Sequence, residues 1–220
     1  LKRGTPTITY LKQLDGFKNF QFSVPPYDLE YVPLVKSENP LNRNPNALYV
    51  FGLKKYTYPN GKLFDIAEHT CTYQYRYELQ KMPGIVSMTS TGPLAYDKIK
   101  SQNGYKFAVA CENMIAEGWM TEKLVDCFMS DTVPIYIGGV LPSFLEKCVC
   151  RITDLDPARA SEKIRDYLSM SDTDYLAKLS DIRELRFSSE LYDLFSYQTL
   201  FNKAGLKIDT LLLDSNGQPF

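Results

Sequence analysis

The pattern of apolar and polar positions is clearest between residues 106 and 139. Residues 106–113, KFAVACEN, form a short apolar run typical of a buried strand. In the next segment, TEKLVDCFMS, the residues Leu124, Cys127 and Phe128 recur at the spacing of one helix face. TVPIYIGG is β-branched and aromatic and stops at Gly138-Gly139, which again indicates a strand. The pattern therefore predicts a βαβ unit, which favours a parallel sheet.

The flanking segments extend this alternation of strands and helices. We expect strands in ALYVFGL (47–53) and GIVSMT (84–89), and a helix in TYQYRYELQKM (72–82) that ends before Pro83-Gly84. Residues 156–171 and 172–205 carry apolar residues at helical spacing and begin with Asp. Residues 1–46 and the Pro59-Asn60-Gly61 turn are rich in loop-forming residues. The predicted class is α/β, with a Rossmann-like parallel sheet and flanking helices.

Charge and composition exclude some classes of partner. The chain has 25 Lys and Arg against 26 Asp and Glu, a net charge of −1. Because no basic excess exists, we predict no nucleic-acid partner, and any phosphate must be bound at a local site. No run of 18 apolar residues is present, so no membrane span is predicted. The chain starts at Leu1 without an initiator methionine, and we expect it to come from a longer protein; peripheral membrane association through other segments stays open.

The five cysteines do not form a recognisable metal or disulfide framework. Their number is odd, no Cys-x-x-Cys pair exists, and Cys148-x-Cys150 lacks further ligands for zinc. We expect reduced thiols, as in a cytosolic-type compartment, with Cys127 in the core. The acidic triplet Asp154-Leu155-Asp156 precedes Pro157, and we interpret it as a helix-start turn rather than a metal site.

Lys123 has an unusual predicted position for a cation. If Thr121 caps the helix, Glu122 and Lys123 lie in its first turn, where a lysine faces the positive end of the helix dipole. The free backbone N–H groups there form an anion site, and a bound phosphate would stabilise the lysine. Glu122 could accept hydrogen bonds from ribose hydroxyls. The alternative is a solvated first turn with both side chains in water.

Residues 106–139 resemble the donor-binding motif of the α-1,3/1,4-fucosyltransferases, glycosyltransferase family 10. That motif has a strand ending in Phe-Glu-Asn, a loop with Gly-Tyr, then Val-Thr-Glu-Lys, a helix, and Thr-Val-Pro-(Ile/Val)-Tyr-x-Gly. The matching positions are Glu112-Asn113, Gly118, Thr121–Lys123 and Thr132–Tyr136. The likeness continues loosely from about Arg76 onwards. The chain departs from the motif at Cys111, Trp119 and Ile137, where the family commonly has Phe, Tyr and Trp.

The resemblance implies a GT-B enzyme that uses GDP-fucose as its donor. By analogy, Lys123 and an upstream arginine, best matched by Arg76, bind the diphosphate. Glu122 holds the ribose, and Asn113 and Trp119 shape the surroundings of fucose and phosphate. For Arg76 a surface helix residue is the alternative, and for Trp119 a packing role. We expect no required cofactor or metal.

The acceptor side is less well defined. The family has a preceding acceptor domain with a catalytic glutamate, and too few residues precede Arg76 for a full domain of that kind. We therefore assign 1–70 to a partial N-terminal, acceptor-side region and 71–220 to a GDP-sugar-binding Rossmann-like domain with C-terminal helices. Glu38 in KSENPLN is the candidate base, with a simple loop glutamate as the alternative. His69 is another conceivable base, although a structural or exposed histidine is the simpler interpretation.

The resemblance implies inverting transfer of fucose to a hydroxyl of an oligosaccharide or glycoconjugate acceptor. Three alternatives stay open: a transferase for another nucleotide sugar, a non-catalytic nucleotide-sugar-binding domain, and an α/β protein without such a site. The family is compatible with a cytoplasmic or membrane-associated protein in bacteria and with the Golgi lumen in eukaryotes, so the location stays undecided.

Overall fold

The structure is a computed structural model that describes residues 7–9, 20–22, 29, 35–51, 72–89, 95–115 and 119–196. Several predictions fall outside these ranges: the turn at 59–61, His69, Cys71, Gly118 and the part of the last helical segment beyond Ser196. Among the described residues, no helix is both long and apolar enough to cross a membrane.

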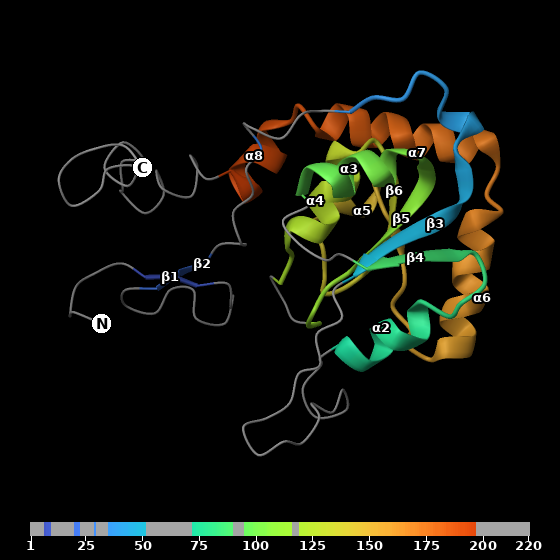
Figure 1. Cartoon of the computed structure of the whole chain (residues 1–220). Helices are drawn as coiled ribbons and strands as arrows, with labels where there is room; N and C mark the ends of the chain where they lie inside the picture. The colour runs from blue at the N-terminus through green and yellow to red at the C-terminus, as the bar shows by residue number, and fades with distance from the viewer. Residues whose placement is uncertain are drawn as a thin grey trace, which may run out of the picture.

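A five-stranded, all-parallel sheet is the centre of the fold (Figure 1). In the order β4-β3-β5-β6-β7, its strands are Ile85–Thr89, Asn44–Phe51, Tyr105–Cys111, Val133–Ile137 and Cys150–Arg151. A separate parallel pair consists of β1 (Thr7–Thr9) and β2 (Phe20–Phe22). This sheet confirms the predicted α/β class. Because β3 precedes residue 71, the sheet takes one strand from the segment assigned to the N-terminal region, and the division at 70/71 stays a prediction.

The helices connect the strands and follow them. They are η2 (Pro40–Asn42), α2 (Tyr73–Leu79), α3 (Ala95–Asn103), α4 (Glu122–Met129), α5 (Ser143–Glu146), α6 (Pro157–Leu168), α7 (Asp172–Leu185) and α8 (Ser189–Phe195). The single helical segment expected from 172 onwards is thus two helices in the described part. Ser188 separates them, because its side chain accepts a hydrogen bond from the Leu191 N–H and caps α8.

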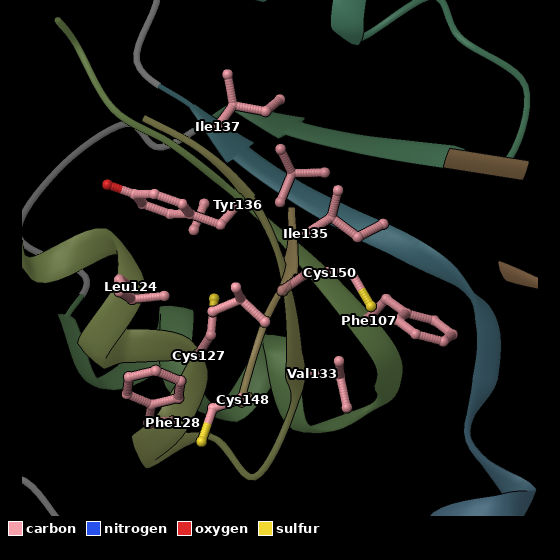
Figure 2. Packing of buried hydrophobic residues seen from close by; sticks show 14 of the residues in the cluster. Phe107, Leu124, Cys127, Phe128, Val133, Ile135, Tyr136, Ile137, Cys148 and Cys150 are labelled. Carbon is pink, nitrogen blue, oxygen red and sulfur yellow. The ribbon is translucent and has the colours of Figure 1, made fainter. Parts of the chain in front are cut away.

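The core lies on both faces of the sheet. On one face Tyr136 of β6 packs towards α4, where Leu124, Cys127 and Phe128 are fully buried (Figure 2). On the other face Phe107 of β5 contacts Tyr175 of α7, with ring centroids 5.7 Å apart. The α4 pattern read from the sequence is therefore the face that covers the sheet. The described cysteines 111, 127, 148 and 150 are free and buried, and burial raises their pKa values, as expected for small core residues.

The Asp154-Leu155-Asp156 triplet forms the predicted helix start. Asp156 accepts a hydrogen bond from the Arg159 N–H and caps α6, and Asp154 accepts one from the Asp156 N–H. Both carboxylates also pair with the Arg159 side chain. Their oxygens therefore serve local capping and an exposed ion pair.

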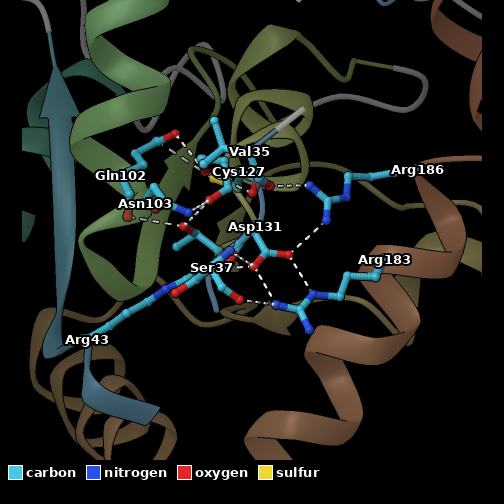
Figure 3. A network of polar contacts seen from close by, with 11 residues as sticks. Val35, Ser37, Arg43, Gln102, Asn103, Cys127, Asp131, Arg183 and Arg186 are labelled. Atoms are coloured by element: carbon cyan, nitrogen blue, oxygen red, sulfur yellow. Dashed lines mark hydrogen bonds and ion pairs between the residues drawn. The ribbon is translucent and has the colours of Figure 1, made fainter. Parts of the chain in front are cut away.

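A buried carboxylate joins several segments of the chain near the amino-terminal ends of the strands. Asp131, which follows α4, is fully buried and pairs with Arg43, Arg183 and Arg186 (Figure 3). It also accepts a 3.0 Å hydrogen bond from the Ser37 N–H. Asp131 has φ 59°, a left-handed conformation that Asp tolerates better than most residues with a Cβ. The cluster ties the segment around residue 37 to α7 and to the turn between α4 and β6.

Candidate functional site

The strand order points to one edge of the sheet as the site for a ligand. From β3 the chain moves outwards to β4, then returns past β3 to β5, β6 and β7. The direction of winding therefore reverses between β3 and β5. In open parallel sheets, ligands bind beyond the carboxyl ends of the strands at such a switch point. Glu112 and Asn113 directly follow β5 and lie at this position.

Lys123 lies in the first turn of α4 with its ammonium held close to the protein. Its Nζ is 2.8 Å from Glu122 Oε1, 3.0 Å from Thr121 Oγ1 and 3.9 Å from Glu112 Oε2. The side chain is 19% exposed. The alternative of a lysine extended into bulk water is therefore not what the structure shows. The Lys123 ammonium therefore lies at the carboxyl end of β5, beside Glu112.

Glu112 is fully buried, which is unusual for a carboxylate. Its Oε1 accepts from the Thr121 N–H at 2.8 Å and its Oε2 from the Thr121 hydroxyl at 2.6 Å. Burial raises the pKa of the Glu112 carboxyl above its ordinary value, although the Lys123 ammonium and the Thr121 hydrogen bonds act in the opposite direction. Glu112 is thus a buried acid whose side chain is hydrogen-bonded to Thr121 and lies beside Lys123.

Glu122 differs from Glu112 in its surroundings. Its side chain is half exposed and pairs with Lys123 Nζ. Partial burial disfavours its charged form, but the charge and hydrogen bond of Lys123, the charge of Lys98 and a hydrogen bond with Thr121 together outweigh this effect and lower the pKa of the Glu122 carboxyl. Glu122 is therefore an ionised, accessible hydrogen-bond acceptor beside Lys123, the state that its predicted role towards ribose requires.

Arg76 approaches the same strand end from α2. Its guanidinium donates to the Cys111 carbonyl at 2.8 Å and to the Asn113 side-chain oxygen. Thr72, just before α2, donates from its N–H to the Asn113 carbonyl at 3.0 Å and from its hydroxyl to the Glu112 carbonyl. The start of α2 is thus hydrogen-bonded to the residues after β5. Arg76 and Lys123 reach Glu112-Asn113 from two different helices.

The remaining predicted residues have different positions. Trp119 is half-buried and lies two residues before Thr121, the N-cap residue of α4. Glu38 is exposed in the loop before η2. Its neighbour Ser37 binds Asp131, which follows the carboxyl end of α4, whereas Lys123 lies at the amino end. The structure therefore brings Arg76, Asn113, Glu122 and Lys123 to one edge and leaves Glu38 at the other, while Trp119 is close to Thr121 along the chain.

The hydroxyl of Thr121 does not act as expected. Thr121 is the N-cap residue of α4, but its side chain accepts no capping hydrogen bond from the helix. Instead it donates to Glu112 and accepts from Lys123. The prediction was correct in position and wrong in bonding, because the hydroxyl oxygen accepts from the charged Lys123 ammonium in place of a backbone N–H of the helix. The backbone N–H groups of the first turn are consequently left unbonded by this side chain.

The residues that support this edge were not predicted to do so: Glu112 was only a matching position of the family motif, and Thr121 only a helix cap. Besides Glu112 and Thr121, they include Gly138, where a Cβ atom would clash with the Tyr136 hydroxyl and lie 2.9 Å from Glu112 Cγ. Arg151 donates to the Gly139 carbonyl at 2.6 Å and lies over the Tyr136 ring. The available signal was an acidic residue at the end of an apolar strand, since a carboxylate in such a run is rarely buried without a partner. For Arg151 no comparable local signal exists.

The described residues show no group of three or more His, Cys, Asp or Glu side chains that could hold a metal ion. The positive groups at the candidate site are Lys123 and Arg76, together with the amino end of α4. This arrangement can bind an anion and stabilise negative charge that develops during a reaction.

The comparison with solved structures supports the fold. No family model matches the sequence, and neither does any curated protein. Among solved structures, one α1,3-fucosyltransferase matches with a TM-score of 0.55 and 19% identity, over 91% of this chain and 65% of that one. An α1,3-fucosyltransferase with GDP matches with the same TM-score and identity, over 91% of this chain and 67% of that one. The chain therefore spans about two thirds of the length of these structures, and its fold is similar to theirs, as residues 106–139 led us to expect.

Proposed function

We propose that this chain is a glycosyltransferase that moves fucose from GDP-fucose to a hydroxyl of an oligosaccharide or glycoconjugate. The observation that carries the proposal is the convergence of Lys123 and Arg76 on the carboxyl end of β5, at the switch point of the sheet. The fold likeness to α1,3-fucosyltransferases, one of them with GDP, supports the choice of donor. The roles of the individual residues are part of the proposal.

In the proposed reaction, an acceptor hydroxyl oxygen forms a bond to the anomeric carbon of fucose. The bond from that carbon to the diphosphate oxygen breaks, GDP leaves with the electron pair, and the hydroxyl proton passes to a base. Lys123, Arg76 and the amino end of α4 would stabilise the charge that builds on the leaving diphosphate. Glu122 would accept hydrogen bonds from ribose, and Asn113 and Trp119 would contact phosphate and fucose.

A direct test is calorimetric titration of the chain with GDP-fucose, GDP, UDP-sugars and CMP-sugars. We expect GDP-fucose and GDP to bind and the UDP and CMP compounds to bind more weakly or not at all. Preference for a UDP-sugar would replace the proposed donor, and absence of binding to all of them would overturn the proposal. Release of GDP from GDP-fucose in the presence of oligosaccharide acceptors then measures the transfer itself.

The Lys123→Ala variant tests the phosphate role of this lysine. Hydrogen bonds to charged groups contribute about 1.5–3 kcal/mol, so we expect GDP to bind roughly 10- to 100-fold more weakly. Lys147→Ala is a matched control. Lys147 lies just before β7 and forms an exposed ion pair with Asp181, so this variant also removes one positive charge. Unchanged GDP affinity in Lys123→Ala would contradict the proposed site.

A second candidate is a nucleotide-sugar-binding domain that does not catalyse transfer. The specific observation in its favour is that Glu38, the base expected from the sequence, lies at the opposite end of α4 from Lys123. The two functions are separated by turnover: the binding domain would bind GDP-fucose and release no GDP with any acceptor tested.

A further inference from the structure

Two charged residues near the carboxyl end of β5 occupy positions that are unfavourable for an isolated charge. Glu112 is a fully buried carboxylate, and transfer of such a group out of water is unfavourable unless it is paired and hydrogen-bonded. Lys123 lies at the positive end of α4, where a cation is disfavoured. Neither placement is explained by packing alone. Each becomes favourable through the other, because the two charges are opposite and 3.9 Å apart.

Thr121 connects the two charges through one continuous chain of hydrogen bonds. Its hydroxyl donates its single proton to Glu112 Oε2 at 2.6 Å, and the same oxygen accepts from Lys123 Nζ at 3.0 Å. The Thr121 N–H gives Glu112 Oε1 a second bond at 2.8 Å. Because the hydroxyl is directed to Glu112, its oxygen lone pairs face the ammonium, and the direction of every bond in the chain is set by the carboxylate.

Glu112 is also fixed through its backbone and by the space around its side chain. The Glu112 N–H continues the sheet by donating to the Ile137 carbonyl at 2.8 Å, and the Glu112 carbonyl accepts from the Thr72 hydroxyl. Gly138 leaves room for its side chain, since a Cβ there would lie 2.9 Å from Glu112 Cγ. A group fixed in this way can orient a flexible lysine side chain, which otherwise loses rotamer freedom when it binds a ligand.

The partners of Lys123 differ in how readily they can give way. Glu122 is half exposed and can move away when an anion binds, whereas Glu112 and Thr121 are buried. A diphosphate can therefore take the place of Glu122 at the ammonium while the buried side of the chain stays intact.

We infer that Glu112 and Thr121 are positioning residues that hold the Lys123 ammonium at the phosphate-binding edge of the sheet. This inference rests on the proposed function, because it assigns the reason for the arrangement to diphosphate binding. It adds two residues to the site that act through Lys123 and need not touch the ligand.

Thr121→Val tests the inference without changing any charge. Valine has nearly the shape of threonine and suits the extended backbone of Thr121, but it breaks the link from Glu112 to Lys123. We expect about tenfold weaker GDP binding by calorimetry, in line with the loss of one hydrogen bond to a charged group. Thr121→Ser keeps the hydroxyl and is expected to restore the wild-type affinity. Thermal unfolding of each variant reports any general loss of stability separately.

The Lys123→Ala background distinguishes positioning from a general structural effect. If Thr121 acts through Lys123, Thr121→Val will not weaken GDP binding further once the lysine is absent. Equal weakening in both backgrounds, or wild-type affinity for Thr121→Val, would overturn the inference while leaving the proposed function standing. Wild-type affinity for Lys123→Ala alone would instead overturn the proposed function. Should Thr121→Val not fold, Thr121→Ala removes the same hydroxyl and serves in its place.

Discussion

At the scale of single residues, buried charges mark the two ends of α4. Glu112 and Lys123 meet at its amino end, and Asp131 meets three arginines after its carboxyl end. The two clusters differ in accessibility to a ligand. Arg43 and Arg186 are almost fully buried and bonded to Asp131, and the cluster joins segments far apart in the sequence. We therefore assign it to stability and not to binding.

Asp131→Asn tests this assignment. The variant keeps a residue suited to the left-handed conformation but leaves the three guanidinium groups without their counter-charge. Breaking a buried ion pair costs about 3–5 kcal/mol, and we expect the free energy of unfolding from urea titration at pH 7 to fall by that amount. Glu78→Gln, in an exposed pair with Lys81, is the control and should cost less than about 1 kcal/mol.

The pKa of Asp131 determines how its stabilising effect changes with pH. Burial alone would raise the pKa of Asp131, but hydrogen bonds from Arg183 and Ser37 and the charge of Arg186 outweigh it and lower the pKa. Its stabilising effect is therefore present above its unfolded-state pKa, about 3.9, and is lost as pH falls through the lower folded-state pKa. The difference between wild type and Asp131→Asn should shrink in acid. A difference that is constant with pH would contradict the ionised role.

At the scale of secondary structure, local sequence accounts for the β5–α4–β6 unit but not for its fine geometry. The helical spacing of Leu124, Cys127 and Phe128 gave the buried face of α4, and Thr121 gave its first boundary. The use of the Thr121 hydroxyl was not foreseen, because its acceptor, Glu112, is nine residues away and comes close only through the fold. The close packing of Gly138, after β6, against Glu112, after β5, likewise depends on two elements that only the fold brings together.

Gly138→Ala tests that packing. The added methyl group would clash with the Tyr136 hydroxyl and crowd Glu112, so we expect a loss of about 1–3 kcal/mol of unfolding free energy. Because Glu112 would move, GDP affinity should also decrease. Gly104→Ala is a matched control, since its Cβ would meet only the Ser101 carbonyl at an ordinary 3.5 Å. If both variants bind GDP and unfold alike, the turn does not support the site.

At the scale of the whole molecule, the sheet collects positive groups from separate helices at one edge. Lys123 comes from α4 and Arg76 from α2, and the helix dipole of α4 adds to them. The fold is similar to that of α1,3-fucosyltransferases, while the chain covers about two thirds of their length. The acceptor site is therefore part of our proposal.

Chelation tests how the proposed leaving group is stabilised. Since Lys123, Arg76 and α4 supply the positive charge in our proposal, we expect GDP affinity and GDP-fucose turnover to be unchanged by EDTA. Addition of Mg²⁺ or Mn²⁺ after dialysis is the control and should not increase either quantity. Activity that disappears with EDTA and returns with one of these ions would show that a metal shares the role.

The sequence by itself determined the α/β class, the helix that follows Thr121 and the position of Glu122 and Lys123 in its first turn. These features depend on residues within one or two turns of each other, so periodicity and capping patterns reveal them. Only the tertiary structure decided that Arg76 meets Asn113, that Glu112 and Thr121 hold Lys123, and that Ser37, the neighbour of Glu38, binds Asp131. Such contacts join residues from different elements, and their partners are chosen by strand order and by the burial of charge, which local sequence does not specify.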